Sequence, residues 1–211
     1  MNNIDIQGFI LLAPPLLFAL TIHEFAHGYV AFFFGDPTAK ALGRLTLNPL
    51  KHLDPIGTLA FFFIHFGWAK PVPVNPNYFK NPRQDMLWVA LAGPATNLAM
   101  AVISALVAKF VVLTASILPL TNVTIAILIP VQKMLVASVW INLVLCIFNF
   151  LPIPPLDGSR ILAGLLPEHL ARPYAALDRY GFIIRILLML TNTISRLIMP
   201  IIAFANHLLL S

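Results

Sequence analysis

His23, Glu24 and His27 form the pattern HExxH within a long apolar stretch of the chain. If this stretch is an α-helix, the two histidines lie on one face of it, about one turn apart. They can then bind one metal ion, while the intervening glutamate approaches a water molecule on that ion. This arrangement is typical of zinc-dependent hydrolysis.

The surroundings of the pattern strengthen this interpretation. The stretch from about Phe9 to Phe34 ends at Gly35-Asp36-Pro37 and is long enough to cross a bilayer as a helix. Ionisable side chains at membrane depth are expensive to bury and are functional by default. We therefore favour a metal site over the alternative, a cluster of polar side chains with a structural role alone.

A catalytic zinc site needs three protein ligands and an open position for water, so a third ligand must come from elsewhere. The candidates are Cys146, His65, Asp54 and Asp157. The stretch from Leu151 to Asp157 favours the last of them, because its three prolines stop a helix and remove backbone donors. Such an extended segment is tolerated at membrane depth only where it lines a protein or water cavity. Asp157, at its end, can therefore turn towards the metal.

The composition is that of a membrane protein. Of 211 residues, 59% are hydrophobic and 10% are charged, with a mean hydropathy of +0.88. The net charge of +5 does not indicate nucleic-acid binding, because the basic residues lie in short loops between apolar runs. The single cysteine, Cys146, excludes an internal disulfide.

Four apolar segments predict membrane-spanning helices. They run from about Phe9 to Phe34, from Met86 to about Leu113, from about Val123 to Phe150, and within Gly181 to Leu210. The segment from Pro55 to Trp68 is too short for a span, so we expect it to be re-entrant or to lie on the membrane surface. The predicted fold is an all-α polytopic membrane protein with about four to six transmembrane helices. Short membrane-associated β-strands or a re-entrant segment are expected near the active site.

The chain is expected to be one membrane-embedded domain over residues 1–211, with its core at about 9–160 and a C-terminal transmembrane region at about 181–210. The distribution of charge predicts its orientation. The two long loops, Gly35 to Asp85 and Asp157 to Tyr180, hold nine Lys and Arg residues, whereas Met1 to Gly8 and Thr114 to Asn122 hold none. The positive-inside rule then places the long loops in the cytoplasm and the N-terminus outside.

The chain resembles the site-2 protease family of intramembrane zinc metalloproteases. The likeness rests on HExxH in a membrane helix and on the later element from Asn149 to Gly158 with its prolines and Leu-Asp-Gly. Between them, Gly67 to Pro76 resembles a loop of the family, and Gly93-Pro94-Ala95-Thr96-Asn97 resembles its Gly-Pro-x-x-Asn helix. All four elements come in the family's order, from Thr21 to about Arg160. The PDZ and CBS domains of many relatives have no counterpart here, so regulation is expected to come from a membrane partner or to be absent.

The resemblance implies a role for each matching residue. His23, His27 and Asp157 would bind one Zn²⁺ per chain, Glu24 would act as general base and acid, and Asn149 would polarise the scissile carbonyl. A hydrogen bond between helices is the alternative role for Asn149. The implied substrates are single-pass transmembrane proteins, cleaved within or near the membrane in regulated intramembrane proteolysis. We expect a multi-pass protein of a prokaryotic cell membrane, with its active site accessible from the cytoplasm.

A helical substrate must be unwound before its peptide bonds can be reached, so an edge that pairs with an extended strand is expected. Gly43 to Leu47 and Pro71-Val72-Pro73-Val74 read as short strands near the membrane, although either is equally consistent with an ordinary loop. We therefore predict that Pro71, Val72, Pro73 and Val74 bind substrate. Asn97 is predicted to line a polar path to the site, with packing between helices as its alternative role.

Two other functions fit parts of the pattern. A membrane zinc-binding or zinc-transport protein would also bury His and Asp, but it gains little from a glutamate that is not a ligand. A catalytically inactive scaffold would not need the two histidines, Glu24 and Asp157 together. Glu24 therefore favours the hydrolase.

Overall fold

The computed structural model describes residues 6–57, 69–117, 119 and 121–211. Four of its helices are long and apolar enough to cross a membrane. They are α1 (Ile6–Phe33), α4 (Pro82–Ile117), α5 (Asn122–Phe150) and α9 (Thr193–Leu210). The described residues are mostly helical and form no sheet, which confirms the predicted all-α polytopic class and all four predicted spans.

Shorter helices lie between and after these spans. The loop after α1 holds α2 (Thr38–Ala41) and two 3₁₀ turns, η1 (Pro49–Lys51) and η2 (Pro76–Tyr78). After α5 the chain forms α6 (Asp157–Leu165), α7 (Glu168–Ala175), the 3₁₀ turn η3 (Ala176–Tyr180) and α8 (Gly181–Leu190).

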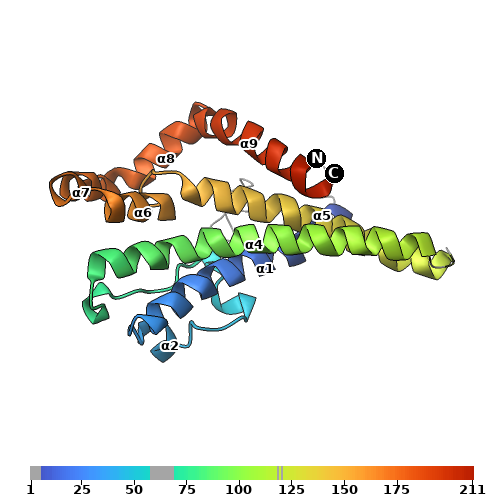
Figure 1. Cartoon of the computed structure of the whole chain (residues 1–211), viewed down its shortest axis with the longest axis horizontal. Helices are drawn as coiled ribbons and strands as arrows, with labels where there is room; N and C mark the ends of the chain where they lie inside the picture. Colours follow the sequence, from blue (N-terminus) through green and yellow to red (C-terminus); the bar gives the residue numbers. More distant parts are fainter. Residues whose placement is uncertain (1–5, 58–68, 118, 120) are drawn as a thin grey trace.

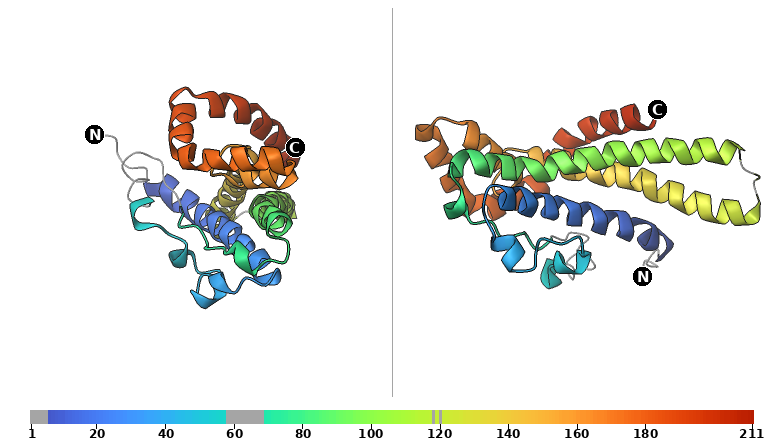
Figure 2. Two further views of the ribbon diagram at one scale, coloured as in Figure 1. Left: turned by 90° about the vertical axis from the view of Figure 1, so that its left-hand side faces the viewer. Right: turned by 60° about the horizontal axis from the view of Figure 1, so that its bottom comes forward.

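The antiparallel pair α4 and α5 forms the centre of the molecule, with α1 packed against both and α9 against α5 (Figure 1). The start of α1 and the end of α9 lie towards the same end of the bundle as the α4–α5 turn, whereas α6 and α7 lie at the opposite end (Figure 2). The α4–α5 hairpin also extends beyond the ends of α1 and α9. Both connections that carry the nine basic residues begin at the end of the bundle opposite the hairpin turn, where α1 and α5 end (Figure 2).

Small side chains let α4 approach its neighbour closely. Ala101 and Ala105 are buried against Val139 and Leu143 of α5, and Ile198 and Ile202 of α9 complete this core. Helices in a bilayer gain little from the hydrophobic effect between them, so close packing of small residues and interhelical hydrogen bonds hold them together. A set of such hydrogen bonds leads from this interface to the predicted metal site.

The C-terminal apolar region is broken into two helices. α8 ends at Leu190 and α9 begins at Thr193, with Asn192 between them at φ 53°. Asparagine tolerates this left-handed conformation better than most residues do. Only α9 is long enough to count among the four candidate spans of the described chain.

The described residues contain one antiparallel bridge, between Leu53 and Ala69, and no longer strand pairing. Gly43 to Leu47, read from the sequence as a short strand, is a series of turns and bends instead. The reason is local, because Gly43 has φ +62° and the Arg44 amide donates back to the carbonyl of Ala39. Most of the predicted re-entrant segment, residues 58–68, lies outside the described residues.

The predicted orientation can be tested by cysteine labelling in a Cys146→Ala background. In intact cells, a membrane-impermeant maleimide should label Asn122→Cys, at the start of α5. It should label Lys51→Cys only after the membrane has been opened. The reverse pattern would contradict the orientation taken from the loop charges.

Candidate metal centre

His23, His27 and Asp157 meet at one point in the bundle. Their ligand atoms all lie within 4.8 Å of one another. The Nε2 atoms of the two histidines are 3.0 Å apart, and Asp157 Oδ2 lies 3.2 Å from that of His23 and 3.3 Å from that of His27. The two histidines come from α1 and the aspartate from the start of α6, more than 120 residues later in the chain. The structure thus brings together the three residues predicted as metal ligands.

The other nitrogen of each ring is held by an acceptor on α4. His27 Nδ1 lies 2.6 Å from the backbone oxygen of Val89, which can only accept, so Nδ1 carries the proton. His23 Nδ1 lies 2.6 Å from Asn97 Oδ1. The Asn97 amide nitrogen faces Asn142 Oδ1 at 2.8 Å and the backbone oxygen of Ala19 at 3.3 Å, and this orientation of the carboxamide leaves Oδ1 to accept from His23.

These partners show that the cluster suits a cation. With both Nδ1 atoms protonated, a neutral imidazole presents an Nε2 lone pair, so the 3.0 Å pair of Nε2 atoms is not a hydrogen bond. The buried Asp157 Oδ2 also lacks a hydrogen-bond partner among the described residues. Two nitrogen lone pairs and an anionic oxygen converge as they do in catalytic zinc sites.

The proline-rich turn positions Asp157. α5 ends at Phe150, and the amides of Ile153 and Leu156 donate to carbonyls within the turn. A Cβ atom on Gly158 would lie 2.3 Å from the oxygen of Phe150, so only glycine allows the chain to fold back this closely. α6 then starts at Asp157 itself, which places the carboxylate beside α1 rather than beyond the end of α5.

Gly93 allows α4 to pass directly over the histidines. A Cβ atom at this position would lie 2.4 Å from His27 Nε2 and 2.6 Å from His23 Cε1. Neither distance is physically accessible, so the close approach of α4 that brings Val89 and Asn97 to the two Nδ1 atoms depends on this glycine. The sequence indicated Gly93 only through a family motif and gave no physical reason for it.

Glu24 lies on α1 beside the cluster but is not one of its three members. Its Oε2 accepts a 2.7 Å hydrogen bond from the backbone amide of Val72. Because Pro71 and Pro73 have no amide hydrogen, Val72 is the only backbone donor of residues 71–73. The carboxylate is half-buried, so it remains partly accessible while one of its oxygens is fixed.

The segment around Val72 is anchored at both ends. The Lys70 amide donates to the carbonyl of His52, and the Asn75 amide donates to Asp36 Oδ2. Arg44 is buried and donates to the carbonyl of Lys70. The residues predicted to bind substrate therefore form an extended segment beside Glu24, and Val72 itself is buried.

Asn97 and Asn149 differ in their surroundings. Asn97, which we expected to line a substrate path, has an exposed fraction of 0%, and both ends of its carboxamide bind protein atoms. It supports His23 instead of facing a cavity. Asn149 is half-buried near the end of α5, where its amide donates to the carbonyl of Leu145 one turn earlier. No described contact joins Asn149 to the three clustered residues.

The other candidate ligands lie elsewhere. Cys146 is a buried residue of α5, and the Asp54 carboxylate accepts from the amide of Gly57. His65 falls outside the described residues. Among the residues that the structure describes, Asp157 is thus the candidate that joins the two histidines.

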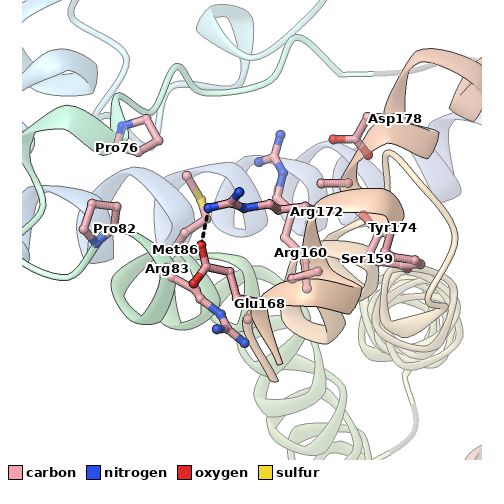
Figure 3. Close-up of a pocket in the computed structure, with 14 residues that line it drawn as sticks. Pro76, Pro82, Arg83, Met86, Ser159, Arg160, Glu168, Arg172, Tyr174 and Asp178 are labelled. Carbon is pink, nitrogen blue, oxygen red and sulfur yellow. Dashed lines mark hydrogen bonds and ion pairs between the residues drawn. The ribbon is translucent and has the colours of Figure 1, made fainter. Parts of the chain in front are cut away.

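A groove of about 470 Å³ lies between the start of α4 and the helices α6 and α7 (Figure 3). Arg83 lines it from α4, Arg160 from α6 and Arg172 from α7, where Arg172 pairs with Glu168. Ser159, two residues after Asp157, also lines the groove, although the three clustered residues do not. The groove therefore borders the segment that carries the aspartate, at the end of the bundle that holds the basic loops.

Comparison with protein-family models agrees with this site. The model of peptidase family M50, the site-2 protease family, matches residues 11–191, which include both histidines, Glu24 and Asp157. The chain belongs to peptidase family M50. Its relatives include "Putative zinc metalloprotease YwhC" of Bacillus subtilis, with 42% identity over 193 residues, covering 90% of this chain and 85% of that protein.

More distant relatives carry a similar name. "Putative zinc metalloprotease Rip2" of Mycolicibacterium smegmatis is 29% identical over 197 residues, covering 89% of this chain and 70% of the relative. Its namesake in Mycobacterium tuberculosis is 28% identical over the same length. No solved structure matches the chain. Family and relatives together identify a zinc metalloprotease, and the apolar helices make it a multi-pass membrane protein.

Proposed function

We propose that this protein hydrolyses peptide bonds within or near the transmembrane segment of single-pass membrane proteins, in regulated intramembrane proteolysis. One zinc ion per chain would be held by His23, His27 and Asp157. The observation that carries the proposal is the position of Glu24, beside the three converging ligand atoms but outside their set. A protein that only carries zinc has no use for this additional carboxylate.

Glu24, Val72 and Asn149 each have a different role in the proposed hydrolysis. A zinc ion bound here would lower the pKa of a bound water and polarise a carbonyl oxygen. Glu24 takes a proton from the attacking water and returns it to the leaving amine. The amide of Val72 keeps the Glu24 carboxylate in one orientation during both transfers. Asn149, once released from the carbonyl of Leu145, donates to the oxygen of the scissile carbonyl as negative charge develops on it.

We further propose that water and substrate reach the site from the cytoplasmic side of a prokaryotic cell membrane. The basic loops and the groove beside α6 support this, because both belong to the end of the bundle that the positive-inside rule assigns to the cytoplasm. The clustered residues lie at membrane depth, since His23 is ten residues, or about 15 Å, from the end of α1 at Phe33. A substrate helix must therefore unwind locally before it is cut.

The test is reconstitution of the zinc-loaded protein in liposomes with a single-span reporter that carries a helix-loosening residue. We expect two fragments whose new termini map within or next to the reporter's span, and no zinc accumulation inside the vesicles. Zinc uptake without cleavage would instead support the carrier. Cleavage confined to soluble peptides would contradict the proposed substrate class.

A further inference from the structure

A chain of buried polar side chains runs from His23 into the interface of α4 and α5. Asn97 accepts from His23 at 2.6 Å and donates to Asn142 Oδ1 at 2.8 Å. Asn142 donates to the carbonyl of Ser138 at 2.9 Å, and the hydroxyls of Ser138 and Ser104 are 2.8 Å apart. Asn97, Asn142, Ser138 and Ser104 are all buried, and the two asparagines have exposed fractions of 0%.

The backbone carbonyl of Ser138 fixes the direction of these hydrogen bonds. The carbonyl of Ser138 can only accept, so the Asn142 amide nitrogen faces it and Asn142 Oδ1 faces Asn97. The Asn97 amide nitrogen then faces Asn142, which turns Asn97 Oδ1 towards His23. His23 is thereby held with its proton on Nδ1 and its Nε2 lone pair towards Asp157. The carboxamides of Asn142 and Asn97 thus carry the hydrogen-bond direction set by Ser138 on α5 to the His23 ring, whose Nε2 faces the metal site.

We propose that Asn142 is a positioning residue for the metal ligand His23 and acts through Asn97. The proposal rests on the metal site described above. Without Asn142, the Asn97 amide would keep only the long 3.3 Å contact with Ala19, and its carboxamide would be free to turn. A turned carboxamide presents a donor to His23 Nδ1, which favours the wrong tautomer. Such outer partners of a ligating histidine typically contribute tenfold to a hundredfold to metal affinity.

The test measures zinc affinity by competition with a chelator, together with the visible absorption spectrum of the cobalt-substituted protein. Asn142→Leu preserves approximate volume but removes the acceptor, so zinc affinity should fall by about tenfold or more and the cobalt spectrum should shift. Asn142→Asp should retain most of the affinity. In this buried position its neutral form accepts from Asn97 and donates to the carbonyl of Ser138, as asparagine does.

Ser104→Ala is the matched control. It removes a hydrogen bond from the same buried interface but leaves both carboxamides in place. If Asn142 only holds the helices together, Ser104→Ala and Asn142→Leu should act alike on zinc affinity. We expect Ser104→Ala to bind zinc as the unchanged protein does. Thermal unfolding in detergent reports any loss of helix packing separately for each variant.

A double-mutant cycle gives the sharpest outcome. Asn97→Ala should lower zinc affinity, and adding Asn142→Leu should lower it little further, because the second residue acts through the first. If the loss of zinc affinity in the double variant equals the product of the losses in the two single variants, the proposal is overturned. Unchanged zinc affinity and an unshifted cobalt spectrum in Asn142→Leu would overturn it too. Absence of zinc from the unchanged protein would instead refute the metal site itself, so the two failures are distinguishable.

Discussion

Replacing Glu24 by glutamine is expected to lower cleavage of a membrane-spanning reporter by at least about a hundredfold, the usual scale for loss of a general base. Zinc should remain bound, because Glu24 is outside the cluster of ligands. Glutamine keeps the size of the side chain, and its oxygen can still accept from the amide of Val72. It cannot take a proton from water, so the loss should fall on catalysis alone.

The measurement is zinc content and initial cleavage rate on the same reconstituted sample. Glu24→Asp is the matched variant, because it keeps a carboxylate but withdraws it by one methylene group. Its rate should lie between those of Glu24→Gln and the unchanged protein. If Glu24→Gln cleaves as fast as the unchanged protein, the mechanism proposed here is wrong even if the metal site is correct.

Gly93→Ala should have a comparably large effect, on metal binding instead of catalysis. The new methyl group would fall 2.4 Å from His27 Nε2, so either α4 or the metal-facing nitrogen must move. Since a ligand itself is displaced, we expect zinc affinity to fall by about a hundredfold or more, the upper end of the range for changes around a metal site. Alanine is the better helix former, so α4 should not lose helicity.

Gly164→Ala separates this effect from crowding in general. Its methyl group would meet the side chain of Leu87 at 2.8 Å, where α6 packs against α4 away from the histidines. We expect Gly164→Ala to lower thermal stability but to retain zinc. Equal loss of zinc in both variants would show that the site responds to any change in helix packing, and would contradict the specific role of Gly93.

The sequence predicted the spans and the metal ligands for related reasons. Long apolar segments predict spans because a bilayer sets their length. HExxH predicts a metal site because helical periodicity places His23 and His27 on one face. Asp157 was favoured because the prolines before it stop the helix and leave an extended segment, at whose end the aspartate can turn towards the metal. In each case, the structural feature is determined by residues that lie close together in the sequence.

Features that depend on contacts between residues far apart in the sequence could not be predicted from such local patterns. Asn97 and Asn142 are 45 residues apart, and nothing in their spacing predicts that they form a hydrogen bond. The sequence left Asn97 between a substrate path and helix packing, and the structure places it behind His23. The break at Asn192 was also missed, because a polar stretch as short as Thr191-Asn192-Thr193 inside an apolar segment does not by itself predict the end of a helix. The sequence left Gly43 to Leu47 between a short strand and an ordinary loop, and the structure shows turns and bends there.

The central claim is that one zinc ion, held by His23, His27 and Asp157, makes this protein a hydrolase. The most direct test measures zinc per chain and reporter cleavage together for the unchanged protein and for His23→Ala, His27→Ala and Asp157→Ala. We expect about one zinc ion per unchanged chain, a sharp loss of zinc and of cleavage in each variant, and loss of cleavage by the unchanged protein when a chelator removes the metal. Full zinc retention in Asp157→Ala, or cleavage by metal-free protein, would contradict the account.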